Sequence, residues 1–165
     1  SLGGGLALAH AAQHPDRVAS VTAVAPAGLG PDINMAYIDG FVAEKRAKKL
    51  RPVLEMLVAN PDLISKDMVE DVLKFKRLDG VDQALAKLRD GCFADGNQKV
   101  TLRDKLDGIK VPVQVVVGEK DQILSASHAD GLPAGIKVTR FADAGHMPHM
   151  EKAADVNELI RSLVT

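Results

Sequence analysis

Three residues far apart in the sequence carry the side chains that acyl transfer through a serine requires. Ser1 offers a hydroxyl nucleophile, His146 an imidazole base to take its proton, and Asp121 a carboxylate to orient that imidazole. Asp121 and His146 each follow a predicted strand, at the carboxyl end where parallel sheets place functional groups. We therefore predict that Ser1, Asp121 and His146 form a catalytic triad.

The residues around Ser1 are small, as a nucleophile in a tight turn requires. Ser1-Leu2-Gly3 matches the second half of the G-x-S-x-G elbow, in which a serine occupies a strained turn between a strand and a helix. Gly4 and Gly5 would let the next helix begin close to the sheet, because glycine tolerates close backbone approach. The amino-terminal end of that helix would stabilise an oxyanion.

Each member of this triad also has a simpler interpretation. A serine at the start of a chain is usually an exposed end, and an aspartate after a strand is often only a turn residue. Glu119 and Asp143 are alternative acids, although Asp121 has the better position on its loop. The agreement of chain order with the predicted elements favours the triad.

The remaining histidines give no second site. His10, His14 and His128 are expected to be ordinary residues of a helix surface or a loop. A metal site built from His146, His149 and Glu151 is disfavoured, because a proline at position 148 interrupts any helix that would align them. We expect no metal.

Two basic stretches lie in the middle of the chain, at residues 45–51 and 74–77. Charge runs of this kind usually form a solvated helix face. The sharper hypothesis is that Lys74, Lys76 and Arg77 contact the phosphates of a nucleotide-like acyl carrier.

The elements that must position these residues alternate between helix and buried strand. A helix from Gly3 ends at the His14-Pro15 step, and residues 17–25 are typical of a buried strand. Further strands are predicted at 111–118 and 136–141, and a helix at 155–164 with an apolar stripe of Val156, Leu159, Ile160 and Leu163. This alternation predicts an α/β fold with a parallel sheet.

Residues 31–97 differ in character, since they show amphipathic helical patterns and no strand signal. Breaks with turn chemistry at residues 60–62, 79–80 and 95–97 divide the region. We predict a lid of four helices at 31–97, inserted into a core formed by residues 1–30 and 98–165.

The composition excludes several classes of protein. The 165 residues are 46% hydrophobic and 26% charged with a net charge of -1, which gives no electrostatic argument for nucleic acid or a membrane surface. No apolar run approaches the ~18 residues of a membrane-spanning helix. The single cysteine, Cys92, fits a reducing compartment, and we expect a cytoplasmic protein.

Several motifs together resemble the α/β-hydrolase superfamily over its second half. They are Ser-Leu-Gly-Gly at the start, Pro-Asp-Arg-Val at 15–18, Val-Gly-Glu-Lys-Asp at 117–121 and Ala-Gly-His-Met-Pro-His-Met-Glu at 144–151. The chain order serine, aspartate, histidine is also the order of that fold. Residues 25–34 and 73–82 look more specifically like the dihydrolipoamide acetyltransferase components of acetoin dehydrogenase complexes, in the C-terminal half of their catalytic domain.

This resemblance implies a function for the whole protein. An acetyl group would move from a lipoyl thioester to coenzyme A, with both groups as substrates and no cofactor bound in this stretch. Ser1 would be the nucleophile, Asp121 the acid, His146 the base, and the backbone N–H of Leu2 one oxyanion donor. The partners would be the other components of a complex like that of the 2-oxo-acid dehydrogenases.

Two alternatives stay open from the sequence. The same triad could hydrolyse an ester, a thioester or a carbon–carbon bond, or the chain could be an inactive assembly or binding half-domain. By the resemblance, a lipoyl domain, the central strands and the second oxyanion donor belong to an N-terminal portion outside this chain. We therefore expect residues 1–165 alone to be inactive, and to form a homo-oligomer or associate with that N-terminal half.

Overall fold

The computed structural model describes residues 1–164, and its core is a small parallel sheet. The elements in chain order are α1 (Leu2–Gln13), η1 (Pro15–Arg17), β1 (Val21–Val24), α2 (Met35–Ala43), α3 (Ala47–Glu55), η2 (Pro61–Leu63), α4 (Lys66–Lys76), α5 (Val81–Cys92), β2 (Phe93–Ala94), β3 (Asn97–Gln98), η3 (Arg103–Gly108), β4 (Val113–Gly118), η4 (Ala126–Ala129), β5 (Ile136–Phe141), α6 (Pro148–Glu151) and α7 (Ala153–Val164).

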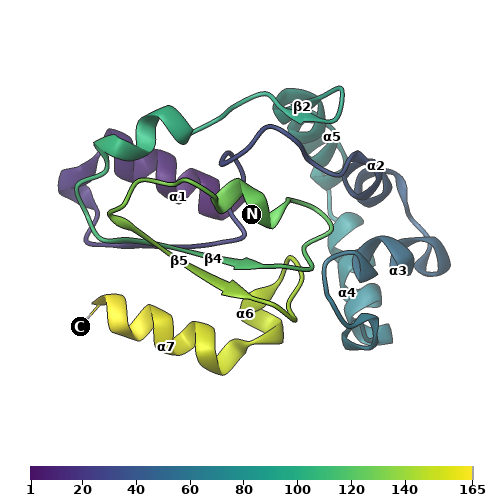
Figure 1. Cartoon of the computed structure of the whole chain (residues 1–165). Helices are drawn as coiled ribbons and strands as arrows, with labels where there is room; N and C mark the ends of the chain where they lie inside the picture. The colour runs from purple at the N-terminus through teal and green to yellow at the C-terminus, as the bar shows by residue number, and fades with distance from the viewer. Residues whose placement is uncertain (165) are drawn as a thin grey trace.

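The sheet has the order β1-β4-β5, and both of its pairings are parallel. Val113 of β4 lies opposite Val21 of β1 on one side and Ile136 of β5 on the other. Figure 1 shows α1 and α7 on opposite faces of the sheet, with α2–α5 beyond the carboxyl ends of the strands. The predicted α/β architecture with a parallel sheet is confirmed.

The central strand β4 is buried along its whole length, as its continuous apolar sequence predicts. Its one polar side chain, Gln114, donates to the Thr22 hydroxyl at 2.8 Å and to the Leu159 carbonyl at 2.7 Å. Leu8 of α1 packs with Ala23 and Val115 in the main hydrophobic core. These contacts fix the sheet and therefore the loops at its carboxyl edge.

Residues 35–92, which we call the helical segment, form α2, α3, α4 and α5 and have a second core. Its buried members are Leu50, Leu54, Val58, Ile64, Val69 and Leu73. Met147, which precedes α6, and Met150 within it pack against the same cluster. The helical segment therefore contacts the chain that follows the last strand.

Three expectations about the elements are wrong in detail. The first strand begins at Val21 rather than residue 17, because Pro15–Arg17 forms a 3₁₀ turn. Strands β2 and β3 form a two-residue hairpin in the region where no strand was expected, around a turn with positive φ at Asp95 and Gly96. In α7 only Val156 of the expected stripe is buried, and Ile160 is 39% exposed.

No helix among residues 1–164 combines the length and the apolar character that crossing a membrane would require.

Candidate active site

Asp121 and His146 lie in contact at the carboxyl edge of the sheet. The His146 Nδ1 and the Asp121 Oδ2 are 2.7 Å apart, and the two side chains are only 6% and 2% exposed. An ionised carboxylate only accepts hydrogen bonds, so Nδ1 carries the proton and Nε2 is the ring atom free to act as a base. The structure thus brings together the two residues predicted as acid and base.

The Asp121 carboxylate is oriented by its own loop. Its Oδ1 accepts the backbone N–H groups of Ile123 at 2.7 Å and Leu124 at 3.0 Å, which leaves Oδ2 directed at His146. These hydrogen bonds form an Asx-type turn, which explains an aspartate at this position. Both carboxylate oxygens therefore have defined partners.

The loops after β4 and β5 pack closely enough to hold the pair in register. The N–H of Lys120 donates to the Ala144 carbonyl at 2.9 Å. A side chain on Gly118 would lie 2.1 Å from the Gly145 carbonyl oxygen, so only glycine fits there. The close approach of these two loops is what brings residues 121 and 146 together.

Ser1 precedes the first residue of α1 and lies at the same edge of the sheet, beside the end of β1. Its carbonyl accepts the N–H groups of Gly5 and Ala27, each at 3.0 Å, which fixes it beside the end of β1. Within residues 1–164 no hydrogen bond joins the Ser1 hydroxyl to the His146 ring.

Leu2, whose N–H is predicted to be an oxyanion donor, lies at the amino-terminal end of α1. Leu2 is the first residue of the helix, so its N–H is among the amino-terminal groups that no carbonyl of the helix accepts. The chain at the end of β1 is strained here, since Ala25 has a φ of 41°. Strain of this kind is typical of functional turns.

An apolar cavity of about 410 Å³ opens at Ser1 and Leu2. Its other walls come from α1, from α2 and α5 of the helical segment, and from Ile123. Tyr37 is a polar exception, and burial raises the pKa of its phenol to about 12. The phenol therefore remains a neutral hydrogen-bond donor at physiological pH.

His149 lies at the same edge of the sheet. Burial lowers the pKa of its imidazole.

The amino-acid sequence from residue 1 to residue 153 matches the α/β hydrolase fold family. The chain belongs to that family. Members of this fold carry their nucleophile, acid and base in that chain order, and Ser1, Asp121 and His146 follow each other in the same order.

Curated relatives include two acetyltransferases. The chain is 45% identical over 161 residues to the dihydrolipoyllysine-residue acetyltransferase component of the acetoin cleaving system of Cupriavidus necator. It is 45% identical over 159 residues to the protein of the same name from Pseudomonas putida. The matches cover 98% and 96% of this chain but only 43% and 42% of those relatives.

Solved structures share the fold at low sequence identity. A mutant of the meta-cleavage product hydrolase CumD from Pseudomonas fluorescens IP01 superposes with a TM-score of 0.83 at 16% identity. The superposition covers 98% of this chain and 61% of that one. At this identity the likeness supports the architecture alone.

The alternative acids lie away from the histidine ring. Glu119 pairs with Arg140 at 3.1 Å, and Asp143 pairs with Lys152 at 2.5 Å, which lowers the pKa of the Asp143 carboxyl. Neither carboxylate bonds to His146 among the described residues. Residues 1–164 also contain no group of three or more histidine, cysteine or acidic side chains arranged to hold a metal ion.

The three basic residues predicted to meet phosphates differ in their surroundings. Lys74 is exposed and pairs with Asp71 at 2.8 Å, and Arg77 is also exposed. Lys76 is buried, and its ammonium donates to the Phe41 and Val42 carbonyls at the end of α2. Its burial contradicts the expectation that residues 74–77 form a solvated face.

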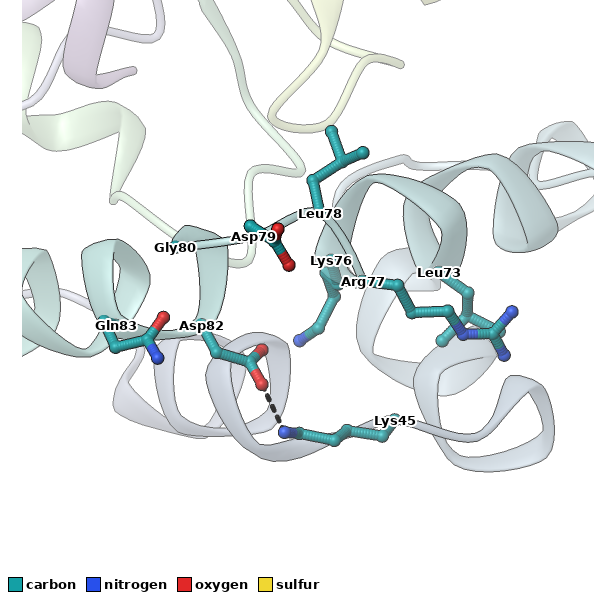
Figure 2. Close-up of a pocket in the computed structure, with 9 residues that line it drawn as sticks. All are labelled: Lys45, Leu73, Lys76, Arg77, Leu78, Asp79, Gly80, Asp82 and Gln83. Atoms are coloured by element: carbon teal, nitrogen blue, oxygen red, sulfur yellow. Dashed lines mark hydrogen bonds and ion pairs between the residues drawn. The ribbon is translucent and has the colours of Figure 1, made fainter.

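Lys76 and Arg77 instead line a cleft of about 320 Å³ between α4 and α5. Figure 2 shows the Lys45 ammonium paired with Asp82 across this cleft. None of its lining residues lines the cavity at Ser1, so the structure does not bring Lys76 or Arg77 to the triad.

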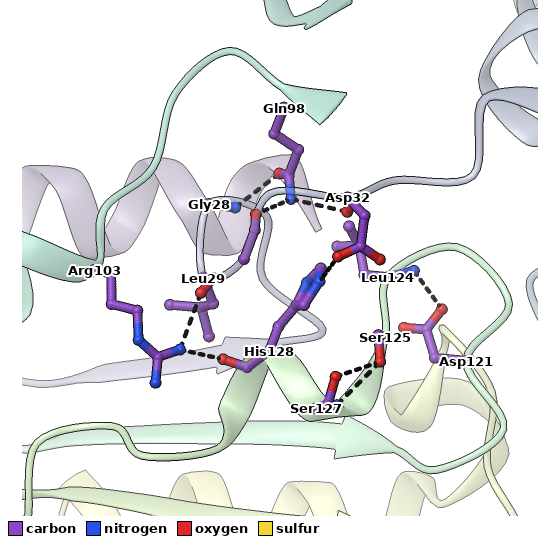
Figure 3. A network of polar contacts seen from close by, with 11 residues as sticks. Gly28, Leu29, Asp32, Gln98, Arg103, Asp121, Leu124, Ser125, Ser127 and His128 are labelled. Atoms are coloured by element: carbon purple, nitrogen blue, oxygen red, sulfur yellow. Dashed lines mark hydrogen bonds and ion pairs between the residues drawn. The ribbon is translucent and has the colours of Figure 1, made fainter. Parts of the chain in front are cut away.

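His128 is not the ordinary surface histidine that the sequence suggested. Its ring is buried, and Nε2 lies 2.7 Å from Asp32 Oδ1, as Figure 3 shows. The bond from His128 lowers the pKa of the Asp32 carboxyl. A Cβ atom on residue 30 would lie 2.2 Å from this ring, so only glycine fits there. That glycine is the feature of the sequence that could have indicated the packing of His128.

A second link joins the same two loops. The Asn34 side chain donates to the Gln122 carbonyl at 2.8 Å, and its backbone N–H donates to Ile123 at 3.0 Å. The chain that enters the helical segment is therefore tied to the loop that carries Asp121.

Proposed function

We propose that the full-length protein transfers an acetyl group from a lipoyl thioester to coenzyme A, with Ser1, His146 and Asp121 as its triad. The observation that carries the proposal is the buried Asp121–His146 pair at the carboxyl edge of the sheet, where Ser1 also lies and lines an apolar cavity. The 45% identity to acetyltransferase components of acetoin cleaving systems selects the substrates.

The first half of the reaction forms an acetyl-enzyme. His146 Nε2 takes the proton of the Ser1 hydroxyl as Oγ attacks the thioester carbonyl, and the Leu2 N–H stabilises the developing oxyanion. Asp121 stabilises the resulting imidazolium through Nδ1. Collapse of the tetrahedral intermediate breaks the carbon–sulfur bond, and the leaving thiol takes the proton from His146.

The second half repeats these steps with the thiol of coenzyme A. His146 takes the thiol proton, the sulfur attacks the acetyl-serine, and Ser1 regains its proton as the ester bond breaks. Water could replace the thiol, which would make the protein a hydrolase. The apolar walls of the cavity at Ser1 favour the transfer, because they disfavour water near the acetyl-enzyme.

The test is to give the full-length protein acetyl-dihydrolipoamide with and without coenzyme A. We expect acetyl-CoA to form, little acetate in the absence of coenzyme A, and a loss of roughly 10⁴-fold or more in turnover for Ser1→Ala. Release of acetate at the same rate with or without coenzyme A would identify a hydrolase. Absence of both products would favour a binding or assembly role.

The same proposal names the partners. The full-length protein would work with the other components of an acetoin-cleaving complex, the system named for its relatives.

Lys74 and Arg77 are exposed and remain the candidates for contact with the phosphates of coenzyme A. The ammonium of Lys76 is instead held by backbone carbonyls.

A further inference from the structure

The carboxylate of Glu151 joins two backbone segments that are distant in the sequence. Its Oε2 accepts the N–H of Gly145 at 2.7 Å, and its Oε1 accepts the N–H of Ala59 at 2.7 Å. Gly145 directly precedes His146, and Ala59 follows α3 in the helical segment. We infer that Glu151 is a positioning residue, which holds the histidine loop against the helical segment so that His146 meets Asp121 in register.

The packing around Glu151 leaves these segments little room to move. A side chain on Gly145 would lie 2.8 Å from the Ala59 nitrogen, so the two backbones are already at close range. Val58, next to Ala59, is fully buried in the core of the helical segment. Met147, just before α6, and Met150 within α6 pack against that core.

The chemistry of the bridge explains why a carboxylate stands here. Both partners are N–H donors, and an ionised carboxylate offers an acceptor to each. Charge-assisted hydrogen bonds are roughly twice as strong as neutral ones. A glutamine at this position could accept from one donor but would present its own N–H to the other.

The bridge acts on catalysis through His146 and not on substrate directly. Glu151 does not line the cavity at Ser1. Without the bridge, Gly145 would lose one of the contacts that fix the backbone just before the histidine. A displacement of about 1 Å in a reacting group costs on the order of 10²-fold in rate.

The inference rests on the proposed function only in taking Ser1, Asp121 and His146 as the reacting groups. The test therefore uses hydrolysis of p-nitrophenyl acetate by the full-length protein, with Ser1→Ala defining the turnover that depends on the triad. It also uses the proton resonance of the His146 Nδ1–H in the hydrogen bond to Asp121, which reports the geometry whether or not the protein turns over.

We expect Glu151→Ala to lower kcat about 10²-fold and Glu151→Gln about tenfold, with KM unchanged, at a temperature where circular dichroism shows folded protein. The Nδ1–H resonance should shift or broaden in both variants. Asp143→Asn is the matched control, since it lies on the same loop and, among residues 1–164, forms an ion pair with Lys152 and no bond to Glu151 or His146. It should retain kcat and the resonance.

Wild-type kcat together with an unchanged resonance in folded Glu151→Gln would overturn the inference. So would a loss of activity that follows only the fraction of folded protein. If ester turnover survives Ser1→Ala, the proposed triad fails, and the resonance alone then decides the role of Glu151.

Discussion

Both oxygens of the Asp121 carboxylate form hydrogen bonds, so a substitution at this residue tests the proposed triad directly. Replacing Asp121 by asparagine keeps the acceptor for Ile123 and Leu124 but can place an N–H₂ group opposite His146 Nδ1. The imidazole would then adopt the other tautomer and lose its free base at Nε2. We predict a fall of about 10⁴-fold in kcat for acetyl transfer, with the fold retained.

The alternative acids supply the controls for that prediction. Glu119→Gln and Asp143→Asn remove exposed partners of Arg140 and Lys152 and should change kcat by less than about tenfold. A severe loss in Asp143→Asn together with near-normal turnover in Asp121→Asn would reassign the acid.

The sequence identified the candidate catalytic residues more readily than the hydrogen-bond partners of other buried polar side chains. The spacing of motifs identified Asp121 and His146, because the loops after consecutive parallel strands end at the same edge of a sheet. The pairing of His128 with Asp32 joins positions that are 96 residues apart, and no local pattern marks it. The bridge of Glu151 to Ala59 spans 92 residues and was missed for the same reason.

Among the elements, α4 shows how a charge run can hide a buried residue. Its basic residues were predicted to share one environment. Helical periodicity instead places Lys76 on the same buried face as Leu73 and Lys74 on the exposed face. The Lys76 ammonium then satisfies carbonyls in the last turn of α2, which lack partners within that helix. Burial lowers the pKa of this lysine.

We predict that Lys76→Met destabilises the protein, because it keeps the apolar stem but removes the donor to Phe41 and Val42. The free energy of unfolding should fall by about 1–3 kcal/mol, measured as a lower urea midpoint at constant m. Lys74→Met, which removes only an exposed pair, should change it by less than about 0.5 kcal/mol. A stable Lys76→Met variant with a raised KM for coenzyme A would restore Lys76 to a phosphate site.

Strands and helices differed in how well the sequence located them. The strand predicted at residues 136–141 is confirmed, and so is the helix α1, whose end was predicted from the His14-Pro15 step. The hairpin of β2 and β3 has two residues in each strand, too few to show an alternating pattern. The predicted start of the first strand was wrong because Pro15–Arg17 forms a 3₁₀ turn, and the strand begins only at Val21.

At the scale of the whole molecule, the sheet has a free side. Among residues 1–164, β1 and β5 each pair with β4 alone, so both are edge strands, and the outer edge of Val21–Val24 has backbone groups with no strand partner. Such an edge is a template for association with another strand. The chain spans 43% and 42% of its acetyltransferase relatives, so most of their length has no counterpart in these residues.

We therefore predict that a polypeptide made only of residues 1–165 associates and does not catalyse. A second copy of the chain, or an added N-terminal half, would supply a strand that pairs with the outer edge of β1. Loss of a second oxyanion donor, which the family resemblance places outside these residues, would cost about 3 kcal/mol of transition-state stabilisation. Sedimentation velocity should show dimers or larger species, and p-nitrophenyl acetate should not be turned over above background. Adding the N-terminal half of the full-length protein should restore both a defined assembly and activity, whereas a stable, active monomer of residues 1–165 would contradict the prediction.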